Sequence, residues 1–165
     1  KSFGVAISDG ELISFFESIG VHFYKVIRDG VFNQSFLKSL GKTGKKILVS
    51  VGLCDHKQLL ELVNFLSCIE GDFVLIYTNR KSVELKNLDV TYMDEMKNHW
   101  DKVGYGSHCE DPSNLILVSS HSPSDILFYV KDDKLDVEFP DNIWAIGLSQ
   151  VASILKAVKK EKSLK

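Results

Sequence analysis

The segment Val103 to His108 (VGYGSH) holds the residue of this chain that is best placed to do chemistry. A short apolar run, typical of a buried strand, leads into small residues and then into one histidine. In a parallel α/β protein, ligands bind at the carboxyl ends of the strands. There the His108 imidazole could bind a metal ion or move a proton. The alternative is a loop histidine without a functional role.

Composition and charge favour one globular domain with a sizeable core. The 165 residues are 44% hydrophobic and 25% charged, with a net charge of −2. This balance predicts no strong attraction to nucleic acid or to a membrane, and no stretch is long and apolar enough to span one. The three cysteines (Cys54, Cys68 and Cys109) form no CxxC pair, so reduced thiols in a cytoplasm fit better than a disulfide scaffold. The start at Lys1, without a methionine, suggests a fragment or a trimmed chain.

Six apolar runs predict buried strands, at residues 3–8, 23–27, 45–52, 72–78, 103–106 and 125–130. Helical patterns lie between them and after them, at 9–20, 33–40, 55–69, within 87–101, at 114–120 and at 141–159. Asp9 and Asp55 are expected to cap two of these helices, and the first is expected to carry a wide apolar face. Because the strands are continuously apolar, we expect both faces of a parallel sheet to be covered. The chain has no Gly-rich dinucleotide motif and no phosphate loop.

Motifs along nearly the whole chain resemble, in the same order, those of the sialic acid synthase (NeuB) family. Residues 3–25 resemble F-L-S-T-P-F-D-x-E-S-V-D-F-L-E-x-L-G-V-P-A-Y-K-I, and residues 44–53 are similar to G-K-P-V-I-L-S-T-G-M. Residues 74–79 (VLIYTN) and 103–108 are similar to L-L-H-C-T-N and V-G-Y-S-D-H. The resemblance implies a TIM-barrel-like (β/α)8 fold that condenses phosphoenolpyruvate with an N-acyl sugar to make a nonulosonic acid. It also implies a divalent metal, Mn²⁺ or Mg²⁺, that polarises the sugar aldehyde.

Five positions keep residues to which the resemblance gives a role. Lys45 stands where the family holds phosphoenolpyruvate, and His108 keeps one metal-binding histidine. Three further residues, placed within or at the ends of strands, are candidates for substrate binding: Lys25, Ser50 and Asn79. Three of these residues also have a simpler interpretation: a solvated lysine for Lys45, a lysine reaching the barrel mouth for Lys25, and a turn residue for Asn79. Four other histidines, His22, His56, His99 and His121, are interpreted as surface residues.

The positions that should supply the rest of the metal site are altered. Tyr129 stands for the family's second metal histidine and Leu127 for a glutamate. A phenol is a poor manganese ligand at neutral pH, because its oxygen stays protonated to a pKa near ~10. We therefore expect metal binding at His108 to be weak or absent. Other replacements are Gly30 for a glutamate, Ile76 for a histidine, Ser107 for an aspartate, Arg28 for a small residue, and Lys81 near an expected tyrosine.

The resemblance covers about six βα units of an eight-fold barrel, as one domain over residues 1–165. The family's first two strands and its C-terminal antifreeze-like domain have no counterpart in this sequence. We expect a synthase-like domain that is inactive as this chain alone, or a non-catalytic pseudoenzyme that binds a sugar, an anion or a partner protein. An incomplete barrel exposes apolar surface and strand edges, so a homodimer or a companion domain is expected.

Overall fold

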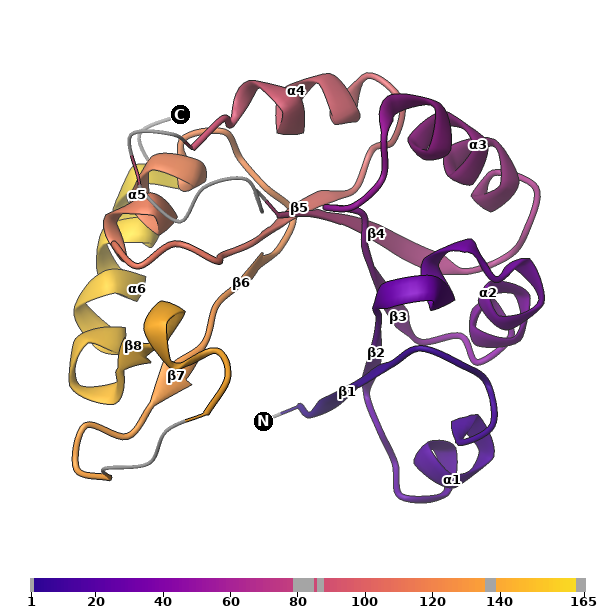
Figure 1. Cartoon of the computed structure of the whole chain (residues 1–165), viewed down its shortest axis with the longest axis horizontal. Helices are drawn as coiled ribbons and strands as arrows, with labels where there is room; N and C mark the ends of the chain where they lie inside the picture. Colours follow the sequence, from indigo (N-terminus) through magenta and orange to yellow (C-terminus); the bar gives the residue numbers. More distant parts are fainter. Residues whose placement is uncertain (1, 79–84, 86–87, 136–138, 163–165) are drawn as a thin grey trace. The chain divides into compact units, whose positions relative to one another are not determined.

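The computed structural model describes residues 2–78, 85, 88–135 and 139–162. The chain divides into two compact units, which are treated one at a time (Figure 1). Unit 1 comprises Lys1–Ile76 with His99–Lys102, and unit 2 comprises Tyr77–Asn98 with Val103–Lys165. No helix among the described residues is both long and apolar enough to cross a membrane.

The sheet of unit 1 follows chain order. Its strands are β1 (Gly4–Ile7), β2 (Phe23–Val26), β3 (Lys46–Ser50) and β4 (Asp72–Tyr77), and all their pairings are parallel. One row across the sheet joins four apolar residues: Ile7, Val26, Val49 and Leu75. Val26, Val49 and Leu75 are fully buried. These β-branched and leucine side chains form the layer between the sheet and its helices.

The helices of unit 1 are α1 (Ile13–Ser18), the 3₁₀ helix η1 (Arg28–Phe32), α2 (Gln34–Gly41) and α3 (His56–Leu66). Two of them begin at side-chain caps. The Asn33 side chain accepts a hydrogen bond from the Phe36 amide, and Asp55 forms a capping box with Gln58, as its position before the apolar run predicted. Helix α3 then buries four apolar residues at helical spacing, Leu59, Leu62, Val63 and Leu66.

Helix α1 departs from the sequence prediction. It begins at Ile13 rather than after Asp9, whose carboxylate accepts a hydrogen bond from the Glu11 amide in the preceding turn. None of its residues is buried. Leu12, Phe15 and Ile19 are 55%, 55% and 50% exposed. The predicted helix start after Asp9 is therefore wrong, and the side of the apolar face that carries Leu12, Phe15 and Ile19 is exposed to solvent.

Unit 2 contains two further strands of the predicted set, β5 (Val103–Gly106) and β6 (Ile126–Leu127), which pair in parallel. Its helices are α4 (Thr91–Lys97), α5 (Ser113–Ser119), the 3₁₀ helix η3 (Asn142–Trp144) and α6 (Leu148–Lys162). Its core contains Met93, Met96, Tyr105, Leu115 and Val118, each no more than 1% exposed. All six predicted strands are thus found, and every strand pairing that the structure describes is parallel, which confirms the α/β prediction.

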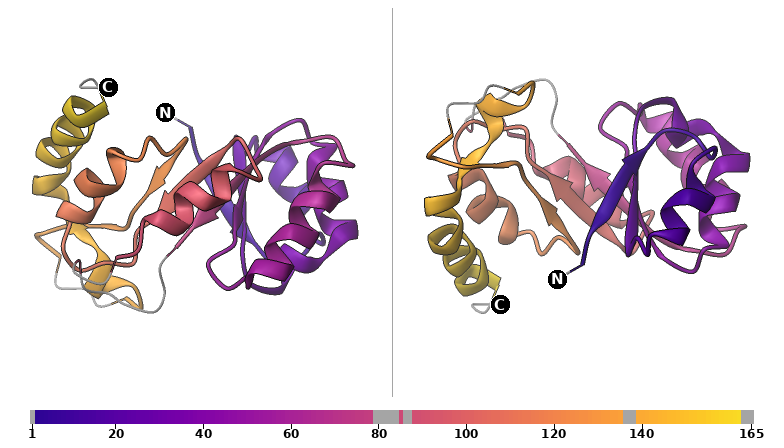
Figure 2. Two further views of the ribbon diagram at one scale, coloured as in Figure 1. Left: turned by 90° about the horizontal axis from the view of Figure 1, so that it is seen from above. Right: turned by 90° about the horizontal axis from the view of Figure 1, so that it is seen from below.

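The final predicted helix begins later than expected. Residues 142–144 form η3, and β8 (Ile146–Gly147) pairs in parallel with β7 (Val130–Lys131), so the helix starts only at Leu148 (Figure 2). The Asp133 carboxylate accepts a hydrogen bond from the Ser149 amide at 2.8 Å and fixes that start. A Cβ on Gly147 would lie 1.9 Å from Asp133 Oδ1, so a larger residue there would displace this carboxylate.

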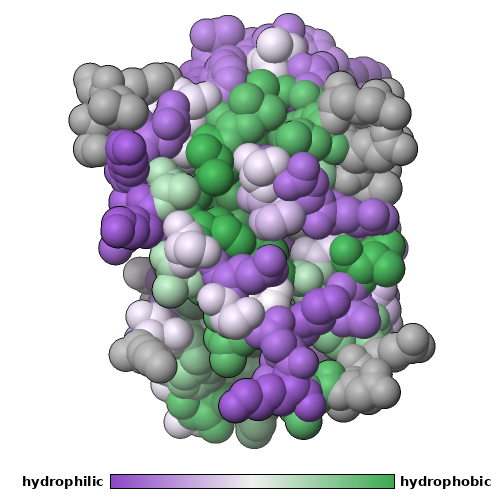
Figure 3. All heavy atoms as spheres, turned by 90° about the vertical axis from the view of Figure 1, so that its left-hand side faces the viewer, coloured by the Kyte–Doolittle hydropathy of each residue, from purple (hydrophilic) through white to green (hydrophobic). Residues whose placement is uncertain are grey.

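Some large apolar side chains of unit 2 remain at its surface. The side that carries α5 and α6 shows hydrophobic surface among hydrophilic patches (Figure 3). The exposed large hydrophobic residues of this unit are Leu117, Val130, Leu135, Ile143, Leu148 and Leu155. Single exposed apolar residues are normal in proteins, so they define no site by themselves.

Candidate functional site

His108 lies against two aromatic side chains of unit 2. Its Nε2 shares a hydrogen bond of 2.9 Å with the hydroxyl of Tyr129, and the two rings stack with centroids 5.5 Å apart. The Trp144 ring lies 4.5 Å from the His108 ring and 6.2 Å from the Tyr129 ring, measured between centroids. We call these three partly buried residues the aromatic cluster. It occupies the carboxyl ends of β5 and β6, where the sequence predicted chemistry.

Backbone register brings the aromatic cluster together. Gly106 pairs with Leu127, and the Ser107 amide donates to the Leu127 carbonyl at 2.8 Å. Two residues further along each strand, the same register places His108 beside Tyr129. The Tyr129 carbonyl then accepts a hydrogen bond from the Ile146 amide, which brings η3 and Trp144 alongside. The resemblance had matched Tyr129 to the second metal histidine, and the structure brings that position to His108.

Two buried polar atoms next to the aromatic cluster lack hydrogen-bond partners among the described residues. They are Nε1 of Trp144 and Oδ1 of Asn142, both in η3. An unsatisfied buried donor or acceptor costs about 1–3 kcal/mol. These atoms therefore retain unused hydrogen-bonding capacity at this end of the strands.

The residues around His108 do not fit a divalent metal. Among the residues that the structure describes, no three His, Cys, Asp or Glu side chains are grouped so that they could hold an ion. The imidazole nitrogen that would face an ion is hydrogen-bonded to a phenol instead. Ser107, in place of the expected aspartate, donates its hydroxyl to Asn114 Oδ1 at 3.0 Å inside the core. Mn²⁺ and Mg²⁺ prefer carboxylate oxygens, which this set does not offer.

Lys25 and Ser50 share one face of the unit 1 sheet. Lys25 pairs with Leu48 across β2 and β3, and Ser50 follows Leu48 by two residues, so the two side chains lie on the same face of adjacent strands. The neighbouring residue Tyr24 points to the opposite face, where its hydroxyl donates to Glu17 of α1. Both Lys25 and Ser50 are partly buried near the carboxyl ends of their strands. The structure thus brings two of the predicted binding residues together.

Lys45 lies at the other end of the sheet, just before β3. Its Nζ donates to the Val21 carbonyl at 2.6 Å and forms an ion pair of 3.0 Å with Glu17. Loss of solvent works to raise the pKa of Glu17, but the hydrogen bond from Tyr24 and the charge of Lys45 outweigh it, so the pKa lies below its usual value. This geometry describes a clamp between α1 and the amino ends of β2 and β3. A substrate role for Lys45 stays a prediction, and Asn79 lies outside the described residues.

Arg28, which the sequence left open as an ion-pair partner of Asp29 or a new anion contact, occupies a strained position. It lies two residues after the end of β2 and has a φ of 54°, in the left-handed region. That conformation costs a non-glycine residue about 1–2 kcal/mol, and such strain clusters at ligand sites. The exposed guanidinium thus lies at the same end of β2 as Lys25. The only sequence signal was an arginine where the related pattern has a small residue.

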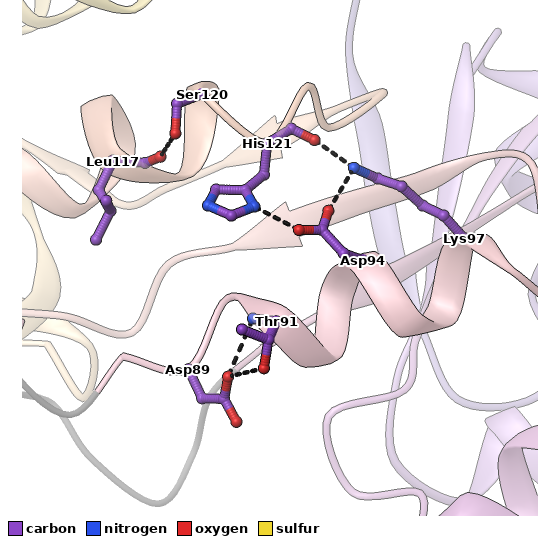
Figure 4. Close-up of polar contacts among 7 residues, drawn as sticks. All are labelled: Asp89, Thr91, Asp94, Lys97, Leu117, Ser120 and His121. Atoms are coloured by element: carbon purple, nitrogen blue, oxygen red, sulfur yellow. Dashed lines mark hydrogen bonds and ion pairs between the residues drawn. The ribbon is translucent and has the colours of Figure 1, made fainter.

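His121 is not a simple surface histidine, so that interpretation is wrong. Its Nδ1 lies 2.5 Å from Asp94 Oδ2, and Lys97 Nζ lies 3.0 Å from Asp94 Oδ1 (Figure 4). Lys97 also donates to the His121 carbonyl. Loss of solvent works to raise the pKa of Asp94, but the bonds from His121 and Lys97 outweigh it and hold that pKa below its usual value. The cluster ties α4 to the turn after α5.

Comparison with known protein families gives a match over most of the chain. A sequence profile described as the NeuB family matches residues 6–160. The chain belongs to the NeuB family. This finding confirms the resemblance read from the motifs. Comparison with curated protein sequences finds no match.

Solved structures of low sequence identity share the fold of this NeuB-family chain. N-acetylneuraminic acid (sialic acid) synthetase of Leptospira borgpetersenii serovar Hardjo-bovis, in complex with citrate, matches 96% of the chain with a TM-score of 0.85 and 14% identity. Spore coat polysaccharide biosynthesis protein spsE of Bacillus subtilis matches 96% with a TM-score of 0.84 and 11% identity. Phospho-2-dehydro-3-deoxyheptonate aldolase of Thermotoga maritima matches 98% with a TM-score of 0.78 and 10% identity. The chain spans 56%, 45% and 50% of these proteins, and at such identities the likeness shows a TIM-barrel-like fold alone.

Proposed function

We propose that this chain is a carbohydrate-biosynthesis domain related to enzymes that condense phosphoenolpyruvate with an N-acyl sugar, and that it does not catalyse the condensation by itself. Membership of the NeuB family supports the first part. The aromatic cluster carries the second. Where a metal ion would activate the sugar aldehyde, His108 is bonded to Tyr129 and packed against Trp144. A cytoplasmic location is part of the proposal, supported by the three free thiols.

The alternative proposal is a pseudoenzyme that keeps ligand binding without catalysis. Lys25 and Ser50 lie on one face near the carboxyl ends of β2 and β3, and Arg28 follows β2. Two cations and a hydroxyl at such an end suit a phosphate or a carboxylate, because the ammonium and guanidinium groups form charge-assisted hydrogen bonds with anions. On this view phosphoenolpyruvate, or another small anion, binds and is not converted.

An assay of condensation and binding tests both statements. Phosphate release from phosphoenolpyruvate with N-acetylmannosamine and Mn²⁺ should not exceed the rate without protein. In NMR titrations, phosphoenolpyruvate should shift resonances of unit 1 in the wild-type chain and in Lys57→Met, a control at a side chain that is 85% exposed. The shifts should be lost in Lys25→Met. Phosphate release that depends on Lys25 would show an active enzyme, and shifts that survive in Lys25→Met would remove the anion site.

A further inference from the structure

A cavity of about 330 Å³ adjoins the amino end of β4 and lies wholly within unit 1. We propose that this cavity binds a small organic cation that carries a primary ammonium group. We call it the Trp100 pocket, and the residues that line it include Ser67, Phe73, His99, Trp100, Asp101 and Lys102. They belong to two internal segments of the chain, 67–73 and 99–102. The inference goes beyond the proposed function, which concerns the carboxyl ends of the strands.

The volume of the Trp100 pocket limits the size of its ligand. Protein cavities that hold small molecules measure about 300–1,000 Å³, and this pocket is at the lower end of that range. A six-membered ring with one substituent, about seven non-hydrogen atoms, is therefore a suitable ligand.

The indole ring of Trp100 is held in position at this pocket. Its Nε1 donates a hydrogen bond to the Phe73 carbonyl at 3.0 Å, and the residue is only partly buried. Because the backbone already uses the indole N–H, the ring offers a ligand its π surface rather than a hydrogen bond. That surface attracts cations within about 6 Å of the ring centre, and tryptophan does so more strongly than the other aromatic residues.

The charges around the pocket also favour a cation. Lys102 Nζ lies 2.6 Å from Asp72 Oδ1, so a carboxylate balances this positive charge. Asp101 is exposed and forms no ion pair with another residue that the structure describes. The lining therefore keeps one carboxylate whose charge a ligand can balance.

Two hydrogen-bond acceptors favour a primary ammonium over a quaternary one. The Ser67 hydroxyl donates to the Val63 carbonyl at 2.9 Å, which leaves the lone pairs of its oxygen to accept. The Asp101 carboxylate is the second acceptor. A primary ammonium has three N–H donors for these oxygens, whereas a quaternary ammonium has none.

NMR titrations of the whole chain test the proposal at about pH 8, above the range in which histidine side chains usually take up a proton. The probes are cyclohexylammonium, its trimethylated form, cyclohexanol and cyclohexanecarboxylate. Cyclohexanol matches the size and shape of cyclohexylammonium and lacks its charge. The readout is the indole N–H resonance of Trp100, one of two tryptophans in the chain, which Trp100→Phe assigns.

Asp101→Asn removes the carboxylate charge at an exposed position and keeps the size of the side chain. Glu110→Gln is the matched control, because Glu110 is also exposed and lies outside the pocket. Circular dichroism verifies that both variants fold.

We expect cyclohexylammonium to bind with a dissociation constant of about 1–10 mM, as suits a ligand of so few atoms. It should bind at least ~5-fold more tightly than cyclohexanol, because an ion pair at ~4 Å contributes about this factor even in water. The trimethylated amine and the carboxylate should bind more weakly. Asp101→Asn should abolish the preference for the cation, and Glu110→Gln should retain it.

Four results would overturn the proposal. The first is a Trp100 resonance that does not shift with cyclohexylammonium up to about 50 mM, well above the expected dissociation constant. The second is binding of cyclohexanol or of the carboxylate that equals or exceeds that of the amine. The third is equal affinity for the trimethylated amine, and the fourth is a preference for the cation that survives in Asp101→Asn.

Discussion

Replacing Tyr129 with histidine should create a divalent-metal site at the aromatic cluster. The imidazole is shorter than the phenol, so the substitution vacates the position of the hydroxyl, which lies 2.9 Å from His108 Nε2. Metal–nitrogen bonds are about 2.1 Å long, so an ion in the vacated space needs a shift of only about 0.8 Å to bond His108. The same space is adjacent to the new imidazole, which would supply a second nitrogen. Adding Leu127→Glu offers the carboxylate oxygen that Mn²⁺ prefers.

The expected gain in affinity is at least ~10-fold, because even residues that only support a metal ligand change affinity by about 10- to 100-fold. Calorimetric titration measures it, with Zn²⁺ for Tyr129→His, since imidazole nitrogen suits zinc, and Mn²⁺ for the double variant. Val130→His is the control, because it adds the same ligand at the next residue, which is not part of the cluster.

Two results would refute this reasoning. The first is an affinity of Tyr129→His equal to that of the wild type or of Val130→His. The second is a gain that persists after His108→Ala is added, because the new site would then not depend on the observed pairing of positions 108 and 129.

Three further predictions concern the unmodified chain and its two ion-pair clusters. The wild type should bind Mn²⁺ weakly or not at all, and calorimetry showing a tight site that His108→Ala abolishes would contradict this. Lys45→Met should lower the free energy of unfolding in urea by about 1–2 kcal/mol, because it leaves Glu17 and the Val21 carbonyl without their cation; an unchanged midpoint would show that the clamp is not stabilising. The pKa of Asp94 is lowered in the folded state, so the stabilisation is fully present above the ordinary aspartate pKa of 3.8 and is lost as the pH falls through the lower pKa of the folded state. Asp94→Asn should therefore be less stable than the wild type at neutral pH, and this difference in the free energy of unfolding should shrink as the pH falls below about 4. The change should be well under ~1 kcal/mol, because solvent screens the pair. A difference that stays constant with pH would contradict the assignment.

Strands β1 to β6 could be predicted from sequence because each lies in a largely apolar run. Burial on both faces makes such runs conspicuous, and β3 (Lys46–Ser50) lies wholly within the predicted 45–52. The capping pair Asp55 and Gln58 is equally local, since cap and partner are three residues apart. Features that depend only on residues a few positions apart can therefore be predicted from the sequence without knowledge of the fold.

The sequence-based predictions are wrong where the local structure depends on contacts between residues far apart in the sequence. The start of α6 depends on Asp133, sixteen residues before Ser149, so the local helical pattern from 141 onward was misleading. Whether the apolar side of α1 is buried depends on what packs over it, and the periodicity of its sequence cannot predict that. The pairing of His121 with Asp94 spans 27 residues and has no local signature. In the candidate site, the motif located His108 and Tyr129, but no pattern indicated that Trp144 would join them.

The aromatic cluster stabilises this end of the strands through contacts between its own side chains. The register of β5 and β6 brings positions 108 and 129 together whatever residues they hold, because it is fixed by backbone bonds such as that from Ser107 to Leu127 at 2.8 Å. With a histidine at both positions, as in the related motif, two imidazole nitrogens would converge, and such a pair suits a metal ion. With Tyr129 the two side chains satisfy one another, and Trp144 packs on His108 at 4.5 Å. Aromatic pairs contribute about 0.5–1.5 kcal/mol each, so the packing of these three rings stabilises this end of the strands.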